Sequence, residues 1–285
     1  MSGFMFALLP VLGWGFMPIL ANLRKSTPEE QLLGTSISAF LFAIVATLIV
    51  LPAFTVTSFV ISLCSGIFWG IGQLLQFRGI RLSSVSTAMP ISNGSQLLFA
   101  TLIAVLFFHE WKTAGQVGVG ILATCLLIIG VIMTGFKKQN QTVKEAVPWQ
   151  VYQTILLSSL FLSFYVVTNQ AFHITGFSII LPQSVGMLIF AFAVNYFKAK
   201  RPIYKNVRFN LLTGLSWSIA NIGMFLATIT LGVATSFSIS QACVIIATLF
   251  GIWIFKEKKA PLEWSFILTG ILLIMASVVL LGMMK

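Results

Sequence analysis

Long apolar runs separated by short polar breaks dominate the pattern along this chain. A helix that crosses a bilayer needs about 20 mostly apolar residues, and runs of that length recur from the first residues to the last. We therefore expect an all-α integral membrane protein with ten transmembrane helices. The predicted ranges are 3–23, 32–52, 57–77, 84–107, 115–135, 150–172, 177–197, 209–230, 233–255 and 264–284.

Composition agrees with a chain that has the bilayer as its solvent. Of 285 residues, 58% are hydrophobic and only 8% are charged, and the mean hydropathy is +1.00. Such a composition excludes a soluble domain of this size. The stretch Gly3 to Leu23 has no basic residues before it and no small-residue cleavage site after it, so it predicts a retained helix rather than a signal peptide. The cysteines, which are odd in number, fall inside apolar runs and predict neither a disulfide nor a metal site: Cys64, Cys125 and Cys243.

The net charge of +11 reports orientation rather than nucleic-acid binding, because the basic residues lie in loops between apolar runs. Only Lys112 and Lys285 fall on one side of the predicted spans. By the positive-inside rule the other side is cytoplasmic, so we expect a multi-pass protein of the cell membrane with both termini extracellular or periplasmic. The residues predicted on the cytoplasmic side are Arg24, Lys25, Arg78, Arg81, Lys137, Lys138, Lys144, Lys198, Lys200, Arg201, Lys205, Arg208, Lys256, Lys258 and Lys259.

An internal repeat links the two halves of the chain. The segments 66–71 and 214–219 align at an offset of 148 positions and bring Trp69 onto Trp217. At the same offset Phe77 aligns with Phe225, and with one gap Glu110 aligns with Glu257. We expect a first five-helix repeat over 1–136, a cytoplasmic linker over 137–149 and a second repeat over 150–285. Because five is odd, the second repeat must enter the membrane from the opposite side, which makes the repeat inverted.

Uncharged polar side chains gather in these repeated spans. Amides in a span serve helix packing as readily as ligand binding. Here each of two amides lies four residues after an indole, on the same helical face. An indole packs on the apolar face of a pyranose, and amides pair with its hydroxyl groups. The predicted substrate-binding residues are Trp69, Gln73, Gln76, Asn93, Gln96, Trp217, Asn221, Ser240 and Gln241, with Trp14, Tyr165, Asn169 and Gln183 as further candidates that could instead be interfacial or packing residues.

Two other features shape the expected site. Pro10 and Pro18 in the first span, and Pro90 with Gly94 in the fourth, are expected to interrupt their helices and free backbone groups. The chain has no Asp, and its six Glu all lie at span ends or in loops. A carrier of quaternary amines would need a buried carboxylate, and a nucleotide-sugar carrier would need buried cations. The pocket is therefore expected to prefer a neutral, polyhydroxylated monosaccharide.

Several motifs follow one another along the whole chain: Gly13-Trp14-Gly15, then segments 69–73, 88–97, 183–187 and 232–241. With them the sequence resembles the bacterial glucose/ribose porter family of the drug/metabolite transporter superfamily, and within it the glucose uptake proteins. The resemblance implies sugar uptake by proton symport through alternating access, without a bound cofactor and with the proton gradient as the driving force. It leaves glucose against ribose open.

The residues themselves give little support for proton coupling, since no carboxylate lies at the expected midplane of the membrane. The candidates for coupling are His109, Glu110 and His173 near the outer face and Glu257 near the inner face. Three other functions stay open: an uncoupled sugar facilitator, an exporter of drugs or metabolites, and a non-transporting membrane protein. An enzyme is not expected, because we find no nucleotide-binding loop or metal-ligand cluster. The oligomeric state is not indicated.

Overall fold

A computed structural model of the chain describes residues 2–108, 113–136, 148–174, 176–198, 201–231, 236 and 239–283. Within these residues every regular element is a helix. The elements are α1 Ser2–Asn22, α2 Pro28–Val50, α3 Val56–Leu82, α4 Val85–Phe108, α5 Ala114–Thr134, α6 Trp149–Ala171, the short 3-10 helix η1 Gly176–Ile179, α7 Ile180–Tyr196, α8 Tyr204–Phe209, α9 Leu211–Leu231, α11 Cys243–Ile254 and α12 Pro261–Met283.

Nine of the predicted ranges coincide with helices that, among the described residues, are long and apolar enough to cross a membrane. The range 233–255 is only partly described, and there the structure has the 12-residue helix α11. One helix was not predicted: the six-residue α8 precedes α9 and carries Lys205 and Arg208.

The prolines do not end their helices. α1 continues through Pro10 and Pro18, and α4 continues through Pro90. A proline removes one backbone hydrogen bond, and transmembrane helices tolerate this loss when neighbouring helices pack around the site. The helix ends are instead set by local capping. At the start of α2, the Thr27 hydroxyl accepts from the Glu30 amide and the Glu30 carboxylate accepts from the Thr27 amide, which is a capping box.

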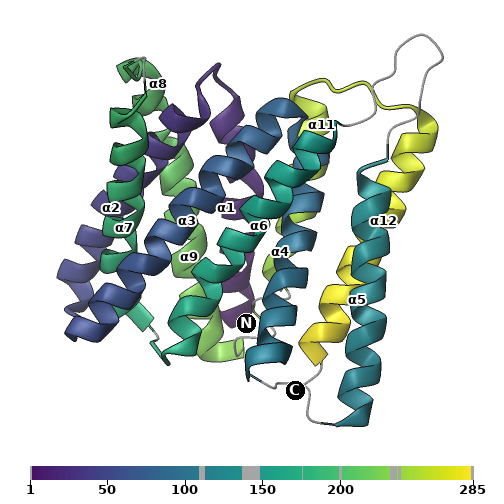
Figure 1. The fold of residues 1–285 in the computed structure, drawn as a ribbon, viewed down its shortest axis with the longest axis horizontal. Helices are drawn as coiled ribbons and strands as arrows, with labels where there is room; N and C mark the ends of the chain where they lie inside the picture. The colour runs from purple at the N-terminus through teal and green to yellow at the C-terminus, as the bar shows by residue number, and fades with distance from the viewer. Residues whose placement is uncertain are drawn as a thin grey trace.

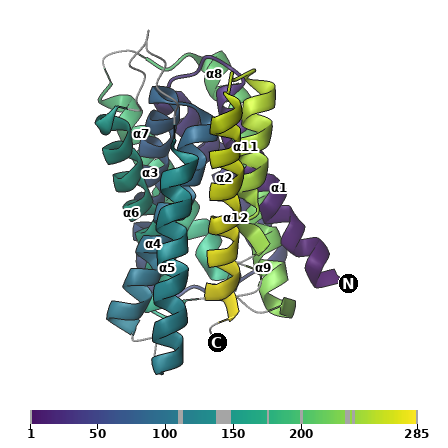
Figure 2. The ribbon, with the colours of Figure 1, turned by 90° about the vertical axis from the view of Figure 1, so that its right-hand side faces the viewer.

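The helices form one bundle in which segments distant in sequence lie side by side (Figure 1, Figure 2). α1 packs along α9 and α3 along α6, while α2 contacts both α7 and α9. α5 and α12 pair with each other at one edge of the bundle. Some of these contacts depend on glycine. A Cβ atom at Gly66 of α3 would overlap the backbone carbonyl of Gln183 in α7, so only glycine allows this approach.

The two ends of the bundle differ in charge. The α1–α2, α3–α4 and α11–α12 connections lie at the end that carries α8, and the termini lie toward the other end (Figure 1). We call the α8 end the basic face, because Arg24, Lys25, Arg81, Lys198 and Lys205 lie there. The sides of the bundle expose large apolar side chains, as Ile49 at 75%, Leu272 at 69% and Ile132 at 68% illustrate. This apolar girdle is what a lipid-facing surface requires.

Candidate functional site

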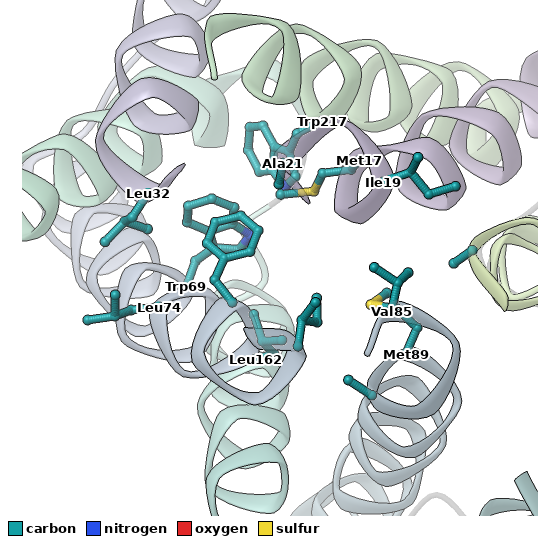
Figure 3. Close-up of a cluster of buried hydrophobic side chains, with 14 of the residues drawn as sticks. Met17, Ile19, Ala21, Leu32, Trp69, Leu74, Val85, Met89, Leu162 and Trp217 are labelled. Carbon is teal, nitrogen blue, oxygen red and sulfur yellow. The ribbon is translucent and has the colours of Figure 1, made fainter. Parts of the chain in front are cut away.

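The indoles of Trp69 in α3 and Trp217 in α9 meet in the centre of the bundle (Figure 3). Their ring centroids are 5.3 Å apart at an interplanar angle of 61°, which is an edge-to-face contact. Both side chains are buried, and both belong to the main apolar cluster, which also includes Met17 and Leu162. The sequence placed both tryptophans in the site, and the structure brings them into direct contact.

Two glutamines that follow Trp69 on α3 form a chain of hydrogen bonds that leads to α4. The Gln73 side-chain nitrogen donates to the Gln76 side-chain carbonyl oxygen at 2.8 Å. The Gln76 side-chain nitrogen donates to the Ser92 hydroxyl of α4 at 2.8 Å. All three side chains are buried. The hydrogen-bond chain therefore connects the indole face of α3 to α4, and its members are neutral donors and acceptors.

A second polar cluster joins α3 to α6 and α7. Ser62 donates to the Asn169 carbonyl oxygen at 2.8 Å, and the Asn169 amide donates to Ser65 at 3.1 Å. Ser65 also accepts from the Gln183 amide at 2.9 Å and donates to the Tyr165 backbone carbonyl at 2.8 Å. Sequence reasoning selected Asn169 and Gln183 but missed the serines. Their recurrence three residues apart, just before the Trp69 motif, was the available signal.

Beside Trp217 the remaining space is small. The Tyr165 hydroxyl donates to Asn221 at 3.3 Å, and the Asn221 amide donates to the Trp217 carbonyl at 2.8 Å. Asn221, Gln183 and Phe225 line a void of about 10 Å³ next to Trp217. A water molecule needs roughly this volume, so the tryptophans and amides are closely packed on the side that faces away from the basic face.

The remaining predicted site residues are not members of the hydrogen-bonded groups described above. The Asn93 amide of α4 donates to the Cys243 sulfur of α11 at 3.4 Å. Gln96 contributes only its backbone carbonyl to the described hydrogen bonds, accepting from Ser163 at 2.9 Å. Ser240 and Gln241 are buried just before α11. Trp14 is half-buried and packs against the main cluster from α1.

Two of the four candidates for proton coupling lie among the described residues. His109 and Glu110 lie outside the described residues. His173 is exposed, after the end of α6, with a positive φ of 54°. Glu257 follows α11 on the basic face, where its Oε2 atom accepts from Ser84 at 3.1 Å and from Ser86 and lies 3.1 Å from the Lys259 ammonium.

Sequence reasoning missed an acidic centre on the basic face. Glu29, in the first turn of α2, pairs with Arg78 of α3 at 2.9 Å and with Lys198 after α7 at 2.6 Å. Glu30 accepts from the Ile203 backbone amide at 2.7 Å and from Asn206 of α8 at 2.9 Å. The two carboxylates thus join α2 to α3 and to the α7–α8 region. Among the described residues no group of three His, Cys, Asp or Glu side chains could hold a metal ion.

A cavity of about 450 Å³ lies on the same face. Its lining includes Ile80 of α3 and Val85 of α4, which are both buried. Ile80 is eleven residues beyond Trp69, about 16 Å along a helix. The fully buried Phe77 lies between them in sequence. The cavity therefore ends before it reaches the tryptophan pair.

Comparison with known proteins identifies a family that this chain matches. The sequence model described as "Sugar transport protein" matches residues 5–284. A protein of Listeria monocytogenes named "Putative sugar uptake protein lmo0424" is 65% identical over 285 residues, covering 100% of both chains. The "Glucose uptake protein GlcU" of Bacillus subtilis is 38% identical over 98% of this chain and 97% of its own. One crystal structure superposes with a TM-score of 0.61 at 14% identity, covering 96% of this chain and 97% of the other, and this likeness concerns the fold alone.

Proposed function

Because the chain belongs to the family of sugar transport proteins, we propose that it takes up a small neutral sugar across the cell membrane and that this sugar is glucose. The observation that carries this proposal is the Trp69–Trp217 pair beside the Gln73–Gln76 amide chain. A pyranose presents an apolar face to an indole and a ring of hydroxyls to amides. The name of the Bacillus subtilis relative favours glucose.

In this proposal the sugar binds between α3, α6 and α9. Trp69 and Trp217 contact its apolar face, and Gln73 and Gln76 exchange their mutual hydrogen bond for bonds to its hydroxyls. Asn221 and Gln183 approach it from the opposite side. A neutral ligand suits these side chains, since none of them carries a charge. We place Asn93, Gln96, Ser240 and Gln241 outside this pocket, while Trp14 packs against the apolar cluster that contains both indoles.

We further propose that the chain crosses the membrane ten times. Nine described helices are long enough, and the two termini lie toward the same end of the bundle (Figure 1). An odd number of crossings would leave the termini on opposite sides. α11 therefore belongs to a tenth crossing. The positive-inside rule assigns the basic face to the cytoplasm.

The helix contacts support two inverted repeats. If α1 to α5 correspond to α6, α7, α9, α11 and α12, then the α1–α9 contact corresponds to α3–α6, and α2–α9 corresponds to α3–α7. The glycines agree: Gly66 of α3 approaches a carbonyl of α7, and Gly214 of α9, 148 positions later, approaches the Thr35 carbonyl of α2. α3 ends at the basic face and α9 begins there, so the two run in opposite directions.

This repeat suggests how access alternates. Phe77 lies eight residues beyond Trp69 toward the basic face, and Phe225 lies eight residues beyond Trp217 toward the other face. In the structure Phe77 is fully buried and Phe225 lines the small void beside Trp217. We assign Phe77 and Phe225 as equivalent inner and outer gates of one site. Rocking one repeat against the other would open one gate while the other stays packed.

Coupling to protons is the part of the proposal that rests on resemblance. The predicted sequence repeat aligns Glu110 with Glu257 when one residue is gapped, and we propose Glu110 as the group that titrates during transport. The competing function is an uncoupled facilitator, which the uncharged centre favours. In a symporter Glu110→Gln abolishes the cytoplasmic acidification that accompanies sugar entry; unchanged acidification removes Glu110 from the mechanism.

Purified protein in liposomes tests the function directly. Labelled glucose and ribose are offered with and without an imposed proton gradient, and a protonophore is added in a parallel sample. We expect saturable glucose entry, with accumulation that the protonophore abolishes. Entry that only equilibrates would favour the facilitator, and preferential ribose entry would change the assigned sugar. No entry of either sugar would contradict the proposed function.

A further inference from the structure

The cavity on the basic face is lined by more cationic than acidic side chains. It opens between the α1–α2 connection, the end of α3, the start of α4 and the end of α11. Three cationic side chains line it: Arg24, Lys25 and Arg81. Its acidic lining residue, Glu257, is paired with the nearly buried Lys259 and accepts hydrogen bonds from Ser84 and Ser86. The excess charge of the cavity is therefore positive.

The three cations have no acidic partner among the described residues, whose ion pairs involve Arg78, Lys198 and Lys259 instead. Arg24 stacks its guanidinium over the Phe209 ring at 5.7 Å, which holds it at the cavity rim. Lys25 and Arg81 are exposed. Three unpaired cations around one concave space attract an anion of more than one charge.

The rest of the lining is polar, with one aromatic wall. The Ser26 hydroxyl accepts from Asn210 and the Thr27 hydroxyl accepts from Lys198, but neither is the donor in a described hydrogen bond, so each can donate to a ligand hydroxyl. The Gln31 nitrogen donates to the Ala21 carbonyl, and Phe255 supplies the aromatic wall. The volume of about 450 Å³ lies within the range of about 300 to 1,000 Å³ that is typical of small-molecule sites. From this geometry we infer that the cavity is a binding site for a phosphate monoester, with Arg24, Lys25 and Arg81 around the phosphate group.

Two sources offer a phosphate monoester on one side of a membrane: a phosphorylated sugar in solution and the headgroup of phosphatidic acid. Arginine and lysine bind phosphate oxygens through charge-assisted hydrogen bonds in either case. The site is distinct from the tryptophan pair, because Phe77, Leu74 and Gln73 are buried between Ile80 and Trp69. Binding at this cavity can therefore be measured whether or not the protein transports a sugar.

The test uses the full chain in phosphatidylcholine vesicles, with labelled inorganic phosphate and labelled glucose 6-phosphate as probes. We expect saturable binding of both, and tighter binding of the phosphohexose. The double substitution Arg81→Gln, Lys25→Gln should weaken both at least about tenfold, since it removes two charged donors. Arg201→Gln, Lys205→Gln removes the same charge from the same face outside the cavity and should change binding less than twofold. No saturable binding, or equal losses in the two variants, overturns the inference.

The salt dependence of binding is measured on the unaltered protein and therefore needs no folded variant. Between 0.1 and 1 M salt the Debye length falls from about 10 Å to about 3 Å, so phosphate binding to the unaltered protein should weaken severalfold. Salt-independent binding contradicts a cationic site. Phosphatidic acid added to the vesicles identifies the source. Competition with glucose 6-phosphate that is lost in the Arg81→Gln, Lys25→Gln variant assigns a lipid headgroup, and unchanged binding assigns the soluble phosphate ester.

Discussion

Trp69 and Trp217 contact each other edge to face, at 5.3 Å between ring centroids, although 148 positions separate them in the chain. They also occupy equivalent positions of the proposed internal repeat. In an assembly with two-fold symmetry, equivalent residues meet only near the symmetry axis. The contact therefore marks where the proposed repeats face each other, which is where transporters built from such repeats bind their substrates.

The amide chain gives the first prediction. Gln76→Ala removes the acceptor of Gln73 and the donor to Ser92, and a buried polar group left unpaired costs about 1 to 3 kcal/mol. We expect glucose affinity to fall about tenfold or more, and a similar fall for Gln73→Ala, in equilibrium binding to purified protein. Gln96→Ala is the control, because its side chain makes no described hydrogen bond. If all three variants bind glucose as tightly as the parent protein, Gln73 and Gln76 serve helix packing instead.

The two phenylalanines give a reciprocal prediction. Phe77→Ala should expose the site from the basic face, and Phe225→Ala should expose it from the other face. The measurement is the labelling rate of Gln73→Cys by an impermeant thiol reagent, after Cys64, Cys125 and Cys243 are replaced by serine. Each substitution should raise the rate severalfold from its own side only. Faster labelling from both sides in either variant would indicate general loosening instead.

The glycine contacts predict a sharp contrast in stability. Gly66→Ala and Gly214→Ala place a Cβ atom on a backbone carbonyl of a neighbouring helix, and overpacking of this kind costs about 1 to 3 kcal/mol or more. We expect lower folded yield and a lower unfolding temperature in detergent. Gly118→Ala is the matched control, since nothing lies within 4 Å of its added Cβ. It should be neutral or stabilising by up to about 1 kcal/mol through helix propensity.

The ion pairs on the basic face give a fourth prediction. Glu29 is 11% exposed at its side chain, while its partners Arg78 and Lys198 are 45% and 30% exposed. Glu29→Gln leaves both cations unpaired, so we expect a loss between the exposed and buried limits, about 1 to 3 kcal/mol. Thermal unfolding at low salt measures it. A smaller difference from the parent protein at 1 M salt should follow from screening, and an unchanged unfolding temperature at low salt would show that the pairs are not stabilising.

Several features of this protein are local and could therefore be predicted from the sequence. An apolar run of about 20 residues predicts a spanning helix wherever it occurs, and the helical repeat places Trp69 with Gln73, and Trp217 with Asn221, on one face. The continuation of α4 through Pro90 is not a local feature of this kind. Whether a proline interrupts a transmembrane helix depends on what packs around it, and the sequence of α4 alone does not contain that information.

The sequence by itself determined which side chains are polar within the membrane and which loops are basic. Only the tertiary structure decided which partners they meet. Asn169 forms hydrogen bonds with Ser62 and Ser65, which lie 107 and 104 positions away in the chain. Asn93 instead donates a hydrogen bond to the Cys243 sulfur. The physical reason is that hydropathy and periodicity describe one helix at a time, whereas a buried hydrogen bond requires two helices to present donor and acceptor at the same depth and rotation.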